Sequence, residues 1–600
     1  MFYNWKYKIY NNLIINKEVH MNKHPDYLLN KISGPKDLKK LSIPEMEKLA
    51  KEIRTLILEK DAAKGGHLGP DLGIVEATIA YHYVFDAPKD KIVWDVSHQT
   101  YPHKMLTGRA QAWLDPNHYD DVTPFTNPDE SPYDYFAIGH TSTSVALATG
   151  MARARDLMGG HENITALIGD GSMTGGLAYE GFNNAAIEKH NLVIVVNDNQ
   201  WSIDKNVSGL VTALKKLRDS NGEAAENPFK AMGFDYRYVA DGNNIQDMIN
   251  AFKAVKDVDH PILLHINTLK GKGYSPALKD EEFHHWVIPF DLKTDKPLTP
   301  EKKPNPNTVA TDVIKEQIKA GNKIIAINAA IPSNFDLDEI KDKYPDHYKD
   351  VGIAEQESVA FATGFAKEGG TPVLFENSSF LQRAFDQLSH DTAANDLPVV
   401  MMVGAGGISS ESKTHLGMFD QVLISNLPNW IYLAPTSLAE EKAMMQWAIK
   451  QRKHPVAIKM PINDVPEDDD NKVIKDYSNI QYQVKPGKDV AVLALGDFYQ
   501  LGAKVASKLN ATLVNPVSAN ILDKDTLDKL AADHKVIVTL EDDALDGGYG
   551  EKVASYLGNK DVKVLNYGQK RVYTDQTPLK EIYKQNHLTV DQIVADVKAL

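Results

Sequence analysis

Short runs of Val, Ile and Leu recur along the 600-residue chain and alternate with stretches in which apolar residues are spaced three or four positions apart. The continuous runs predict buried β-strands, and the spaced pattern predicts amphipathic helices. Strands are predicted at 164–168, 192–196, 324–327, 399–403, 490–495, 512–514, 536–540 and 562–565. Clear helical spacing occurs at 500–509 and 527–532. Apolar strands that alternate with helices are typical of parallel sheets covered on both faces, so the predicted fold class is α/β with mainly parallel sheets.

Two segments interrupt this alternation and are predicted to be linkers. Residues 296–308 are rich in proline and charge, and residues 465–478 contain an acidic run. A single hydrophobic core does not extend over a chain of this length, so we expect several domains. The linkers divide the chain into three predicted α/β domains, at 28–304, 309–464 and 479–600.

The remaining residues, 1–27, are predicted to be a tail or a mis-assigned start, because Met21 offers a second initiation point. They lack the unbroken apolar stretch of a signal peptide. No run in the chain reaches the roughly 18 apolar residues that a membrane span requires. The formal charge of −15 disfavours a general nucleic-acid binder, which needs clustered Lys and Arg. We therefore expect neither a membrane nor a nucleic-acid partner.

The chain contains no cysteine. Disulfides, thiolate metal sites and a cysteine nucleophile are therefore excluded. This composition is consistent with a cytoplasmic protein, which is the location we expect.

Polar clusters follow two of the predicted strands directly. Gly169-Asp170-Gly171-Ser172 ends the first, and Asn197-Asp198-Asn199 ends the second. Ligands of α/β sheets bind beyond the carboxyl ends of strands, so both clusters lie where a site is expected. Carboxylate and carboxamide oxygens suit Mg²⁺, and glycines allow the backbone to approach a diphosphate. A helix predicted at about 174–189 would direct its N-terminus at that group. From the residues alone, the alternative is that both clusters are ordinary turns.

Further polar motifs occur in order along the chain. In the first predicted domain they are 65–69 (Gly-Gly-His-Leu-Gly), 94–104 (Trp-Asp-Val-Ser-His-Gln-Thr-Tyr-Pro-His-Lys) and 139–144 (Gly-His-Thr-Ser-Thr-Ser). In the second they are 353–356 (Ile-Ala-Glu-Gln), 380–383 (Phe-Leu-Gln-Arg), 386–387 (Asp-Gln) and 414–420 (Thr-His-Leu-Gly-Met-Phe-Asp). From about residue 40 to the C-terminus, this ordered set resembles the 1-deoxy-D-xylulose-5-phosphate synthase family. The resemblance implies a transketolase-like thiamine-diphosphate-binding fold.

The resemblance also implies thiamine diphosphate and Mg²⁺ as cofactors. The Gly-Asp-Gly and Asn-Asp-Asn motifs are similar to those with which the family holds a metal-bound diphosphate, which implies Asp170, Asn199 and the carbonyl of Trp201 as metal ligands. Phe380 is expected to pack on the pyrimidine ring. The implied coenzyme contacts are His67, His98, Gly139, His140, Ser142, Gly169, Gly171, Ser172, Asn199, Lys270, Glu355 and Phe380.

In the family, a two-carbon unit from pyruvate is joined, with loss of CO₂, to D-glyceraldehyde 3-phosphate. The coenzyme supplies the organic chemistry, and the protein supplies orientation and electrostatics. By resemblance, Glu355 hydrogen-bonds N1′ of the aminopyrimidine, and His67 and His285 orient the acceptor or exchange protons with it. His284 is the alternative to His285, and His415 is a further catalytic candidate. Histidine suits proton exchange because its usual pKa lies near neutrality.

Four positions depart from the family pattern near the acceptor. Ala405 and Lys459 replace two arginines that hold the acceptor phosphate, Glu411 replaces an aspartate, and Asn377 replaces a tyrosine. Substrate contacts are expected from Arg383, Lys459, Asn377 and Glu411. Lysine is a point charge and alanine offers no donor, so two hypotheses stay open. Either Arg383 and Lys459 bind the phosphate of an ordinary substrate, or the acceptor is a different, unphosphorylated aldehyde or ketone.

Other functions remain open at this stage. A transketolase with a ketose donor would share the cofactor site, and a 2-oxoacid dehydrogenase component would need a lipoyl-bearing partner. A cofactor-binding protein without turnover is disfavoured by the intact Glu355. We expect small-molecule substrates and, as in the family, a homodimer. The third predicted domain resembles the C-terminal domain of transketolases, and residues 541–543 (Glu-Asp-Asp) are expected to form a surface or interface loop.

Overall fold

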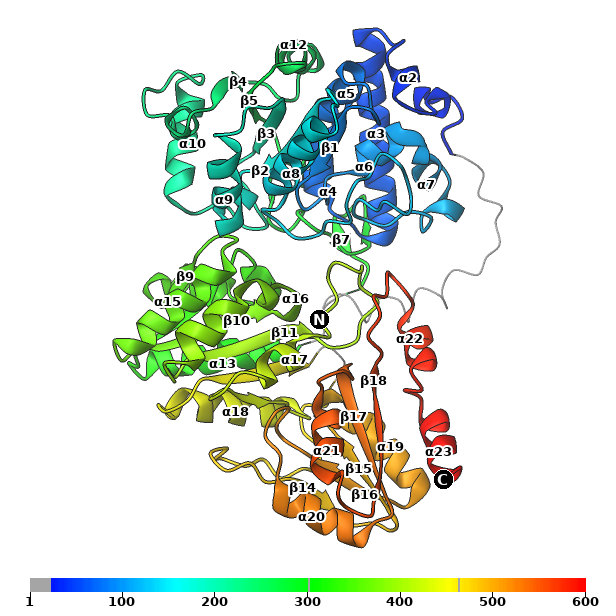
Figure 1. Ribbon diagram of the computed structural model, residues 1–600, viewed down its shortest axis with the longest axis vertical. Helices are drawn as coiled ribbons and strands as arrows, with labels where there is room; N and C mark the ends of the chain where they lie inside the picture. Colours follow the sequence, from blue (N-terminus) through cyan, green and yellow to red (C-terminus); the bar gives the residue numbers. More distant parts are fainter. Residues whose placement is uncertain (1–22, 300–302, 462–464) are drawn as a thin grey trace. The chain divides into compact units, whose positions relative to one another are not determined.

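The computed structural model describes residues 23–299, 303–461 and 465–600 (Figure 1). These residues divide into two compact units. The first unit consists of the described residues up to 299 together with 352–354, and the second unit consists of the others. Most of the predicted tail, 1–27, lies outside the described residues.

The first unit contains a five-stranded parallel sheet with the strand order β1-β2-β3-β5-β4. Its strands are β1 (Lys91–Trp94), β2 (Ile164–Gly169), β3 (Leu192–Asp198), β4 (Asp235–Val239) and β5 (Pro261–Asn267). The middle strand, β3, is buried along its whole length. This burial explains why its sequence reads as an unbroken apolar run.

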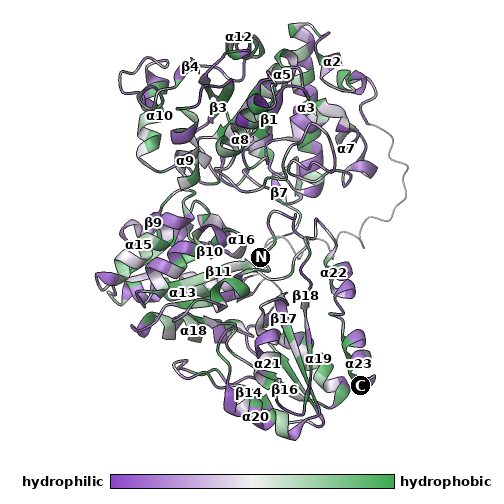
Figure 2. Ribbon diagram, in the orientation of Figure 1, coloured by the Kyte–Doolittle hydropathy of each residue, from purple (hydrophilic) through white to green (hydrophobic). Residues whose placement is uncertain are grey.

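Helices cover both faces of this sheet. Val193 and Val195 of β3 pack in one core with α3, α5 and α12, whereas Ile194 and Val196 pack in another core with α8, α9 and α10. The two cores follow from the alternation of side chains along a strand, and Figure 2 shows the hydrophobic central strands. The helices of this unit are η1 (Leu28–Lys31), α2 (Pro35–Leu38), α3 (Ile43–Lys64), α4 (Leu68–Gly73), α5 (Val75–Val84), α6 (Tyr101–Lys104), η2 (Met105–Arg109), α7 (Gln111–Leu114), η3 (Pro116–His118), α8 (Ser144–Leu157), η4 (Ser172–Thr174), α9 (Gly176–Ala185), α10 (Gly209–Asp219), α11 (Pro228–Met232) and α12 (Ile245–Val255).

The predicted linker at 296–308 is only partly irregular. Strands β6 (Phe290–Asp291) and β7 (Lys296–Pro297) form an antiparallel pair, and α13 (Pro306–Lys319) begins before the predicted linker ends. The side chain of Asn305 accepts a hydrogen bond from the backbone three residues on and caps this helix. A proline directly after such a cap starts a helix, although the local composition resembles that of a loop.

The second unit contains two sheets. One has six parallel strands in the order β12-β13-β11-β10-β8-β9, and the other has five in the order β14-β16-β15-β17-β18. Only the β14–β16 ladder is antiparallel among the ladders of these described strands. The strands are β8 (Ile324–Asn328), β9 (Tyr348–Asp350), β10 (Thr371–Asn377), β11 (Val400–Gly406), β12 (Ile431–Leu433), β13 (Val456–Pro461), β14 (Gln483–Lys485), β15 (Val490–Ala494), β16 (Thr512–Asn515), β17 (Val536–Ala544) and β18 (Lys563–Gln569).

Helices flank both sheets of the second unit. They are η5 (Pro332–Phe335), α14 (Asp338–Lys343), η6 (Pro345–His347), α15 (Glu355–Lys367), α16 (Ser378–Leu381), η7 (Gln382–Ala384), η8 (Gln387–Ala393), α17 (Asp420–Ser425), α18 (Leu438–Lys450), η9 (Gly496–Phe498), α19 (Tyr499–Leu509), α20 (Lys524–Asp533), α21 (Tyr549–Leu557), α22 (Leu579–Gln585) and α23 (Val590–Lys598). The predicted α/β class with mainly parallel sheets is confirmed.

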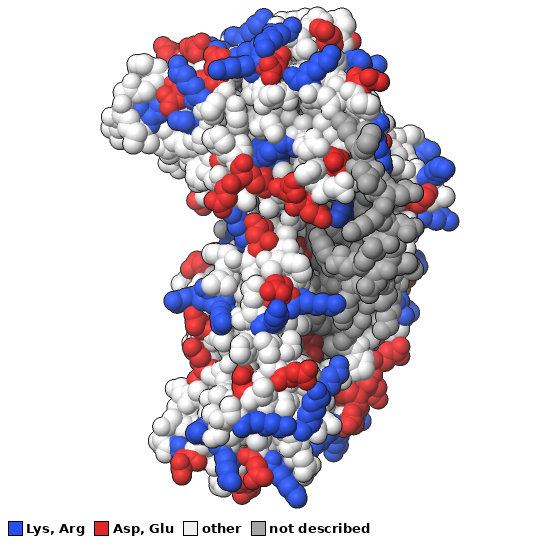
Figure 3. Space-filling view, turned by 90° about the vertical axis from the view of Figure 1, so that its right-hand side faces the viewer, with Lys and Arg blue, Asp and Glu red and all other residues white. Residues whose placement is uncertain are grey.

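The surface carries charges of both signs. On the face shown in Figure 3, acidic and basic side chains of the described residues are interspersed. No helix in the described part of the chain combines the length and the apolar character needed to cross a membrane.

Candidate active site

The carboxyl ends of β2 and β3 bring the predicted metal ligands to one group of loops. Asp170 follows β2, and its Oδ2 accepts a hydrogen bond from the backbone N–H of Gln200 at 2.6 Å. Its Oδ1 accepts from the N–H of Gly171 at 3.1 Å. The Oδ1 of Asn199 accepts from the N–H of Trp201 at 3.1 Å. The Asp170 carboxylate thus holds the backbone between the other two predicted ligands.

Asp198, the middle residue of the Asn-Asp-Asn motif, connects this group of loops to other parts of the first unit. Its carboxylate forms an ion pair with Arg218 and lies 2.9 Å from Nε2 of His265. The Nδ1 of His265 lies 2.8 Å from the hydroxyl oxygen of Tyr236. Burial, followed by the neighbouring Asp198, raises the pKa of Asp170 well above its usual value. This chain of contacts was not predictable from the sequence, because the pairing of β3 with β5 creates it.

The residues of these loops fit a divalent cation and a diphosphate. A buried carboxyl group with a raised pKa is a place where a bound cation would stabilise the ionised form. The expected donors are a carboxylate, a carboxamide and a carbonyl oxygen, all of the hard type that Mg²⁺ prefers. A Cβ on Gly169 would meet its nearest neighbour only at 4.0 Å, whereas one on Gly171 would lie 2.7 Å from the Cβ of Ser202. The backbone is therefore open to a ligand at the first glycine and tightly packed at the second.

No cluster of three or more His, Cys, Asp or Glu side chains within the described ranges could hold a metal ion. The predicted metal ligands are not a cluster of this kind, because Asp170 supplies the one carboxylate and the other donors are a carboxamide and a backbone carbonyl. They remain the predicted metal site of the chain.

The predicted coenzyme segment 139–144 is organised by Asp95. The Oδ1 of Asp95 accepts from the N–H of Ser142 at 2.7 Å, and its Oδ2 accepts from the N–H of Ser144 at 2.9 Å. The Ser142 hydroxyl donates to the carbonyl of Ser172 at 2.8 Å. These bonds bring the Gly-His-Thr-Ser segment, which holds the predicted contacts at 139 and 140, beside the Gly-Asp-Gly-Ser loop. Asp95 belongs to a sequence motif, but its role is visible only in the structure.

Three predicted site histidines from distant segments lie together in the first unit. The ring centroids of His67 and His98 are 5.1 Å apart, those of His98 and His285 are 5.3 Å apart, and those of His67 and His285 are 5.9 Å apart. Burial, followed by the charge of Lys270, lowers the pKa of His98 to about 3 and the pKa of His285 well below its usual value. The pKa values of both rings thus lie below the usual histidine value of about 6.5. Both rings are neutral at pH 7.

Lys270 also lies next to this cluster. Its Nζ donates to the carbonyl of Ser202 at 2.9 Å, and burial lowers its pKa to about 7. The Nδ1 of His285 lies 2.8 Å from the same carbonyl oxygen, whereas the Nε2 of His284 lies 3.0 Å from Asp295. Of the two adjacent histidines, only His285 therefore joins the cluster.

The second unit holds the other candidate catalytic group. Glu355 opens α15, is 3% exposed, and has its two carboxylate oxygens 3.1 and 3.3 Å from Nη1 of Arg383. Glu376, at the end of β10, was not singled out from the sequence; burial and then the charge of Glu355 raise its pKa well above the usual value. The rings of Phe380 and His415 pack edge to face, with centroids 5.7 Å apart. The predicted substrate contact Arg383 thus pairs with the predicted catalytic carboxylate.

Lys459 lies in β13 and is 5% exposed. Its Nζ is 3.1 Å from both the Oδ2 of Asp543 and the carbonyl oxygen of Asp542, and 3.9 Å from the Oδ2 of Asp420. Burial alone would lower the pKa of Lys459, but these carboxylates raise it above its ordinary value. The lysine stays charged, and acidic groups of the protein already balance its charge.

The expectation of a surface or interface loop at residues 541–543 is wrong. These residues belong to β17 and are at most 2% exposed. The Glu541 carboxylate accepts hydrogen bonds from the first two backbone N–H groups of α21 at 2.7 and 2.9 Å. Buried charges of this kind need partners, and the partners come from distant parts of the chain. The sequence shows the three acids but not the groups that satisfy them.

The other positions that depart from the family pattern lie around β10 and β11. Asn377 ends β10 and pairs in register with Gly404 of β11, next to Ala405. Glu411 follows in the loop after β11, and its backbone carbonyl accepts from the N–H of Gln576 at 2.9 Å. Asn377, Ala405 and Glu411 therefore supply no positive charge.

Comparisons with known proteins give the family. Residues 29–225 and 221–268 match the family model of 1-deoxy-D-xylulose-5-phosphate synthase. Residues 302–467 match the transketolase pyrimidine-binding domain, and residues 479–593 match the transketolase C-terminal domain. The 1-deoxy-D-xylulose-5-phosphate synthase of Clostridium acetobutylicum is 34% identical, over 94% of this chain and 98% of the relative. The chain belongs to the 1-deoxy-D-xylulose-5-phosphate synthase family.

A second member of this synthase family, from Methylacidiphilum infernorum, is 36% identical over 88% of this chain and 90% of the relative. Among solved structures, the transketolase of Campylobacter jejuni superposes with a TM-score of 0.40 and 17% identity, over 93% of this chain and 100% of that chain. The assignment to the synthase family rests on the sequence relatives. It confirms the predicted resemblance and the transketolase-like class of fold.

Proposed function

We propose that this synthase-family member condenses pyruvate, with loss of CO₂, and D-glyceraldehyde 3-phosphate to 1-deoxy-D-xylulose 5-phosphate. The observation that carries the proposal is the buried Asp170 carboxylate at the end of β2, hydrogen-bonded to the loop after β3. This arrangement suits a diphosphate held through Mg²⁺. Relatives that are named 1-deoxy-D-xylulose-5-phosphate synthase align with most of the chain and support the same conclusion.

The residues of both units have distinct parts in this proposal. When bound, thiamine diphosphate supplies the nucleophilic carbon and the electron sink for decarboxylation. Asp170, Asn199 and the Trp201 carbonyl would hold Mg²⁺. Glu355, which pairs with Arg383 at 3.1 Å, would hydrogen-bond N1′ of the pyrimidine.

The three clustered histidines have a separate part. His67, His98 and His285 present ring nitrogens that can accept or donate a proton at the acceptor oxygen. His285 is 8% exposed, and a site with little water would protect a reactive two-carbon unit from stray protons.

The second hypothesis, an unphosphorylated acceptor, has one observation in its favour. Arg383 and Lys459, the two cations expected to bind a phosphate, already face carboxylates at 3.1 Å. A phosphate at either would compete with these ion pairs. The activity of the relatives supports the phosphorylated acceptor, and the proposal follows them.

Activity assays test the proposal directly. The protein is supplied with thiamine diphosphate, Mg²⁺ and pyruvate, and CO₂ release is measured with D-glyceraldehyde 3-phosphate or free D-glyceraldehyde. We expect a clear preference for the phosphorylated aldehyde, and turnover with the free aldehyde alone would refute the proposed acceptor. Glu355→Ala is expected to lower kcat about 100-fold or more. Glu357→Ala, an exposed acid on the same helical turn, is the matched control.

Metal dependence tests the Asp170 site separately. Asp170→Ala is expected to remove Mg²⁺-dependent binding of thiamine diphosphate, as measured by calorimetry. Binding that is unchanged by this substitution would show that the diphosphate is held elsewhere.

The assembly and the location are also part of the proposal. The family resemblance supports a homodimer in the cytoplasm. Light scattering on the purified protein would test the dimer, which predicts twice the mass of the 66.6 kDa chain.

A further inference from the structure

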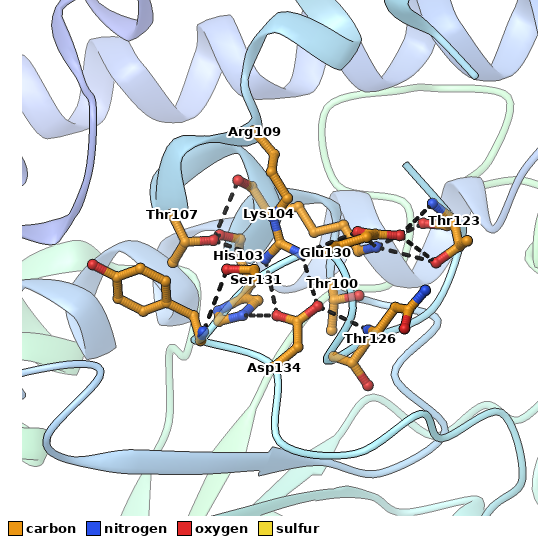
Figure 4. Close-up of polar contacts among 12 residues, drawn as sticks. Thr100, His103, Lys104, Thr107, Arg109, Thr123, Thr126, Glu130, Ser131 and Asp134 are labelled. Carbon is orange, nitrogen blue, oxygen red and sulfur yellow. Dashed lines mark hydrogen bonds and ion pairs between the residues drawn. The ribbon is translucent and has the colours of Figure 1, made fainter. Parts of the chain in front are cut away.

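A buried cluster of charged side chains in the first unit lies outside the residues given a role so far (Figure 4). We name it the loop clamp, and its members come from α6, η2 and the irregular residues 119–138 that follow η3. The loop clamp consists of His103, Lys104, Arg109, Glu130 and Asp134. Their side chains are between 0 and 12% exposed.

Glu130 forms one half of the loop clamp. Its Oε2 lies 2.6 Å from Nζ of Lys104 and 3.1 Å from Nη1 of Arg109. Its Oε1 accepts hydrogen bonds from the backbone N–H and the hydroxyl of Thr123, both at 2.6 Å. Lys104 also donates to the carbonyl of Thr123 at 2.8 Å. Three of these bonds therefore hold position 123 of the segment in place.

Asp134 forms the other half. Its carboxylate oxygens lie 2.7 and 2.9 Å from Nη1 and Nη2 of Arg109, and 3.0 Å from Nε2 of His103. Its Oδ2 also accepts from the backbone N–H of Asn127 at 2.9 Å. Burial opposes the ionisation of Asp134, but His103 and Arg109 hold its pKa below the usual range. The carboxylate therefore stays charged and fixes position 127.

Two further hydrogen bonds link the segment to the His98 motif. The hydroxyl of Ser97 accepts from the N–H of Thr126 at 2.9 Å and donates to the carbonyl of Ile138 at 2.6 Å. Positions 123, 126 and 127 are thus all held, and Phe125 lies between them. The Phe125 ring is 6% exposed, and its centroid lies 5.6 Å from that of His67.

We infer that Phe125 is a specificity-determining wall on the acceptor side of His67, and that the loop clamp consists of positioning residues that hold this wall. The inference rests on the proposed function, because His67 takes its acceptor role from the family. A segment of this length without helix or strand is free to move unless its own bonds restrain it. The loop clamp restrains it with two cations and two carboxylates, which balance each other inside the protein.

The acceptor is the substrate that should sense this wall. Phe125 contacts the ring of His67, whereas the predicted metal ligands belong to the loops after β2 and β3. A displaced Phe125 would admit water and leave the acceptor less well oriented against His67. Loosening the segment should therefore raise the KM for the aldehyde much more than it changes the KM for pyruvate or the affinity for thiamine diphosphate.

The experiment uses the full chain with thiamine diphosphate and Mg²⁺. Glu130→Gln keeps the shape of the side chain and removes its charge. We expect faster amide hydrogen exchange across residues 120–135 and an aldehyde KM about tenfold higher. Phe125→Ala should give the same KM change without faster exchange at the held positions, and Phe125→Leu should restore part of the loss. Asp121→Asn, an acid on the same segment with a 60% exposed side chain, is the matched control.

Three outcomes would overturn the inference. Faster exchange in Glu130→Gln with an unchanged aldehyde KM would show that the segment does not form the wall. Equal changes in both KM values and in cofactor affinity would show a purely structural role. An unchanged aldehyde KM in Phe125→Ala would remove Phe125 as the specificity residue. A wild-type protein that releases no CO₂ from pyruvate would instead refute the proposed function, and the exchange data would still test the loop clamp.

Discussion

Lys270 in the first unit and Lys459 in the second are both buried, with 2% and 5% of their surfaces exposed, but their surroundings differ. Lys270 donates to a backbone carbonyl, and burial lowers its pKa to about 7. Lys459 faces carboxylates of three aspartates, which raise its pKa in spite of the burial. Burial alone therefore does not decide the charge of these lysines. The carboxylates within reach decide it.

The same contrast extends to the groups around each lysine. Near Lys270, His98 and His285 are neutral. The first unit therefore presents uncharged ring nitrogens beside a lysine whose pKa is lowered to about 7. Near Lys459, burial and Asp420 raise the pKa of Asp543 well above its usual value, and Lys459 opposes this rise. The first region suits proton exchange and the binding of an anion, whereas the second is a closed, balanced structural cluster.

The largest expected effect comes from removing the cation of the second cluster. Lys459→Met leaves Asp420 and Asp543 buried without their cation, so we expect the free energy of unfolding to fall by about 3–5 kcal/mol. Urea denaturation of the apoprotein would measure it. Lys459→Arg keeps the charge and should lose much less. A loss below about 1 kcal/mol in Lys459→Met would show that the aspartates take up protons at little cost, and would break the comparison.

Lys270→Met is the matching substitution in the first unit. It removes an amine that burial has already made easy to neutralise, so the expected loss of stability is about 1 kcal/mol or less. The affinity for thiamine diphosphate should nevertheless fall, because the anionic diphosphate loses a neighbouring cation. Calorimetry would separate the two variants. Lys459→Met should mainly lose stability, and Lys270→Met should mainly lose affinity for thiamine diphosphate.

An intermediate effect is expected from two buried histidines. The Nε2 of His82 lies 2.9 Å from the Nδ1 of His103, both residues are 0% exposed, and burial lowers both pKa values. An unfolded histidine has a pKa of about 6.5, so below that pH the unfolded chain binds more protons than the folded one. Stability should therefore fall as the pH drops below about 6.5, by up to about 1.4 kcal/mol per pH unit for each group.

The depressed pKa of Asp134 acts in a separate pH range. Its contribution is complete above the unfolded value of about 3.9 and is lost only as the pH falls further. Urea midpoints at pH 7.5 and 5.5 thus report on histidines rather than on this aspartate. His82→Gln should reduce the loss between these two pH values. An equal loss in the variant and the wild-type protein would show that His82 does not contribute.

The sequence predicted the parts of the site that depend on local patterns. The apolar runs located the strands. The motif glycines and Asp170 were then predicted to belong to the site because they stand at a strand end. Contacts between strands and helices far apart in the chain were not predictable in this way. His265 reaches Asp198 only because β5 pairs with β3. The acids at 541–543 looked like a loop because Lys459, their partner, lies about eighty residues away in the chain.

The smallest expected effect concerns a third buried lysine, Lys60, which is 5% exposed. Burial lowers its pKa to about 7, but its Nζ lies 4.1 Å from the ring centroid of Trp113 and 5.5 and 5.8 Å from those of Tyr101 and Tyr119. Aromatic faces stabilise a cation, so these rings should support the charged form of Lys60, as carboxylates do for Lys459. Trp113→Phe weakens the shortest of these ring contacts, and we expect the contact itself to contribute about 0.5 kcal/mol of stability. A double-mutant cycle with Lys60→Met separates this contact from lost packing, since the packing loss appears in both backgrounds. A coupling near zero at pH 7 would show that rings do not replace carboxylates here, and Lys60 would then behave like Lys270.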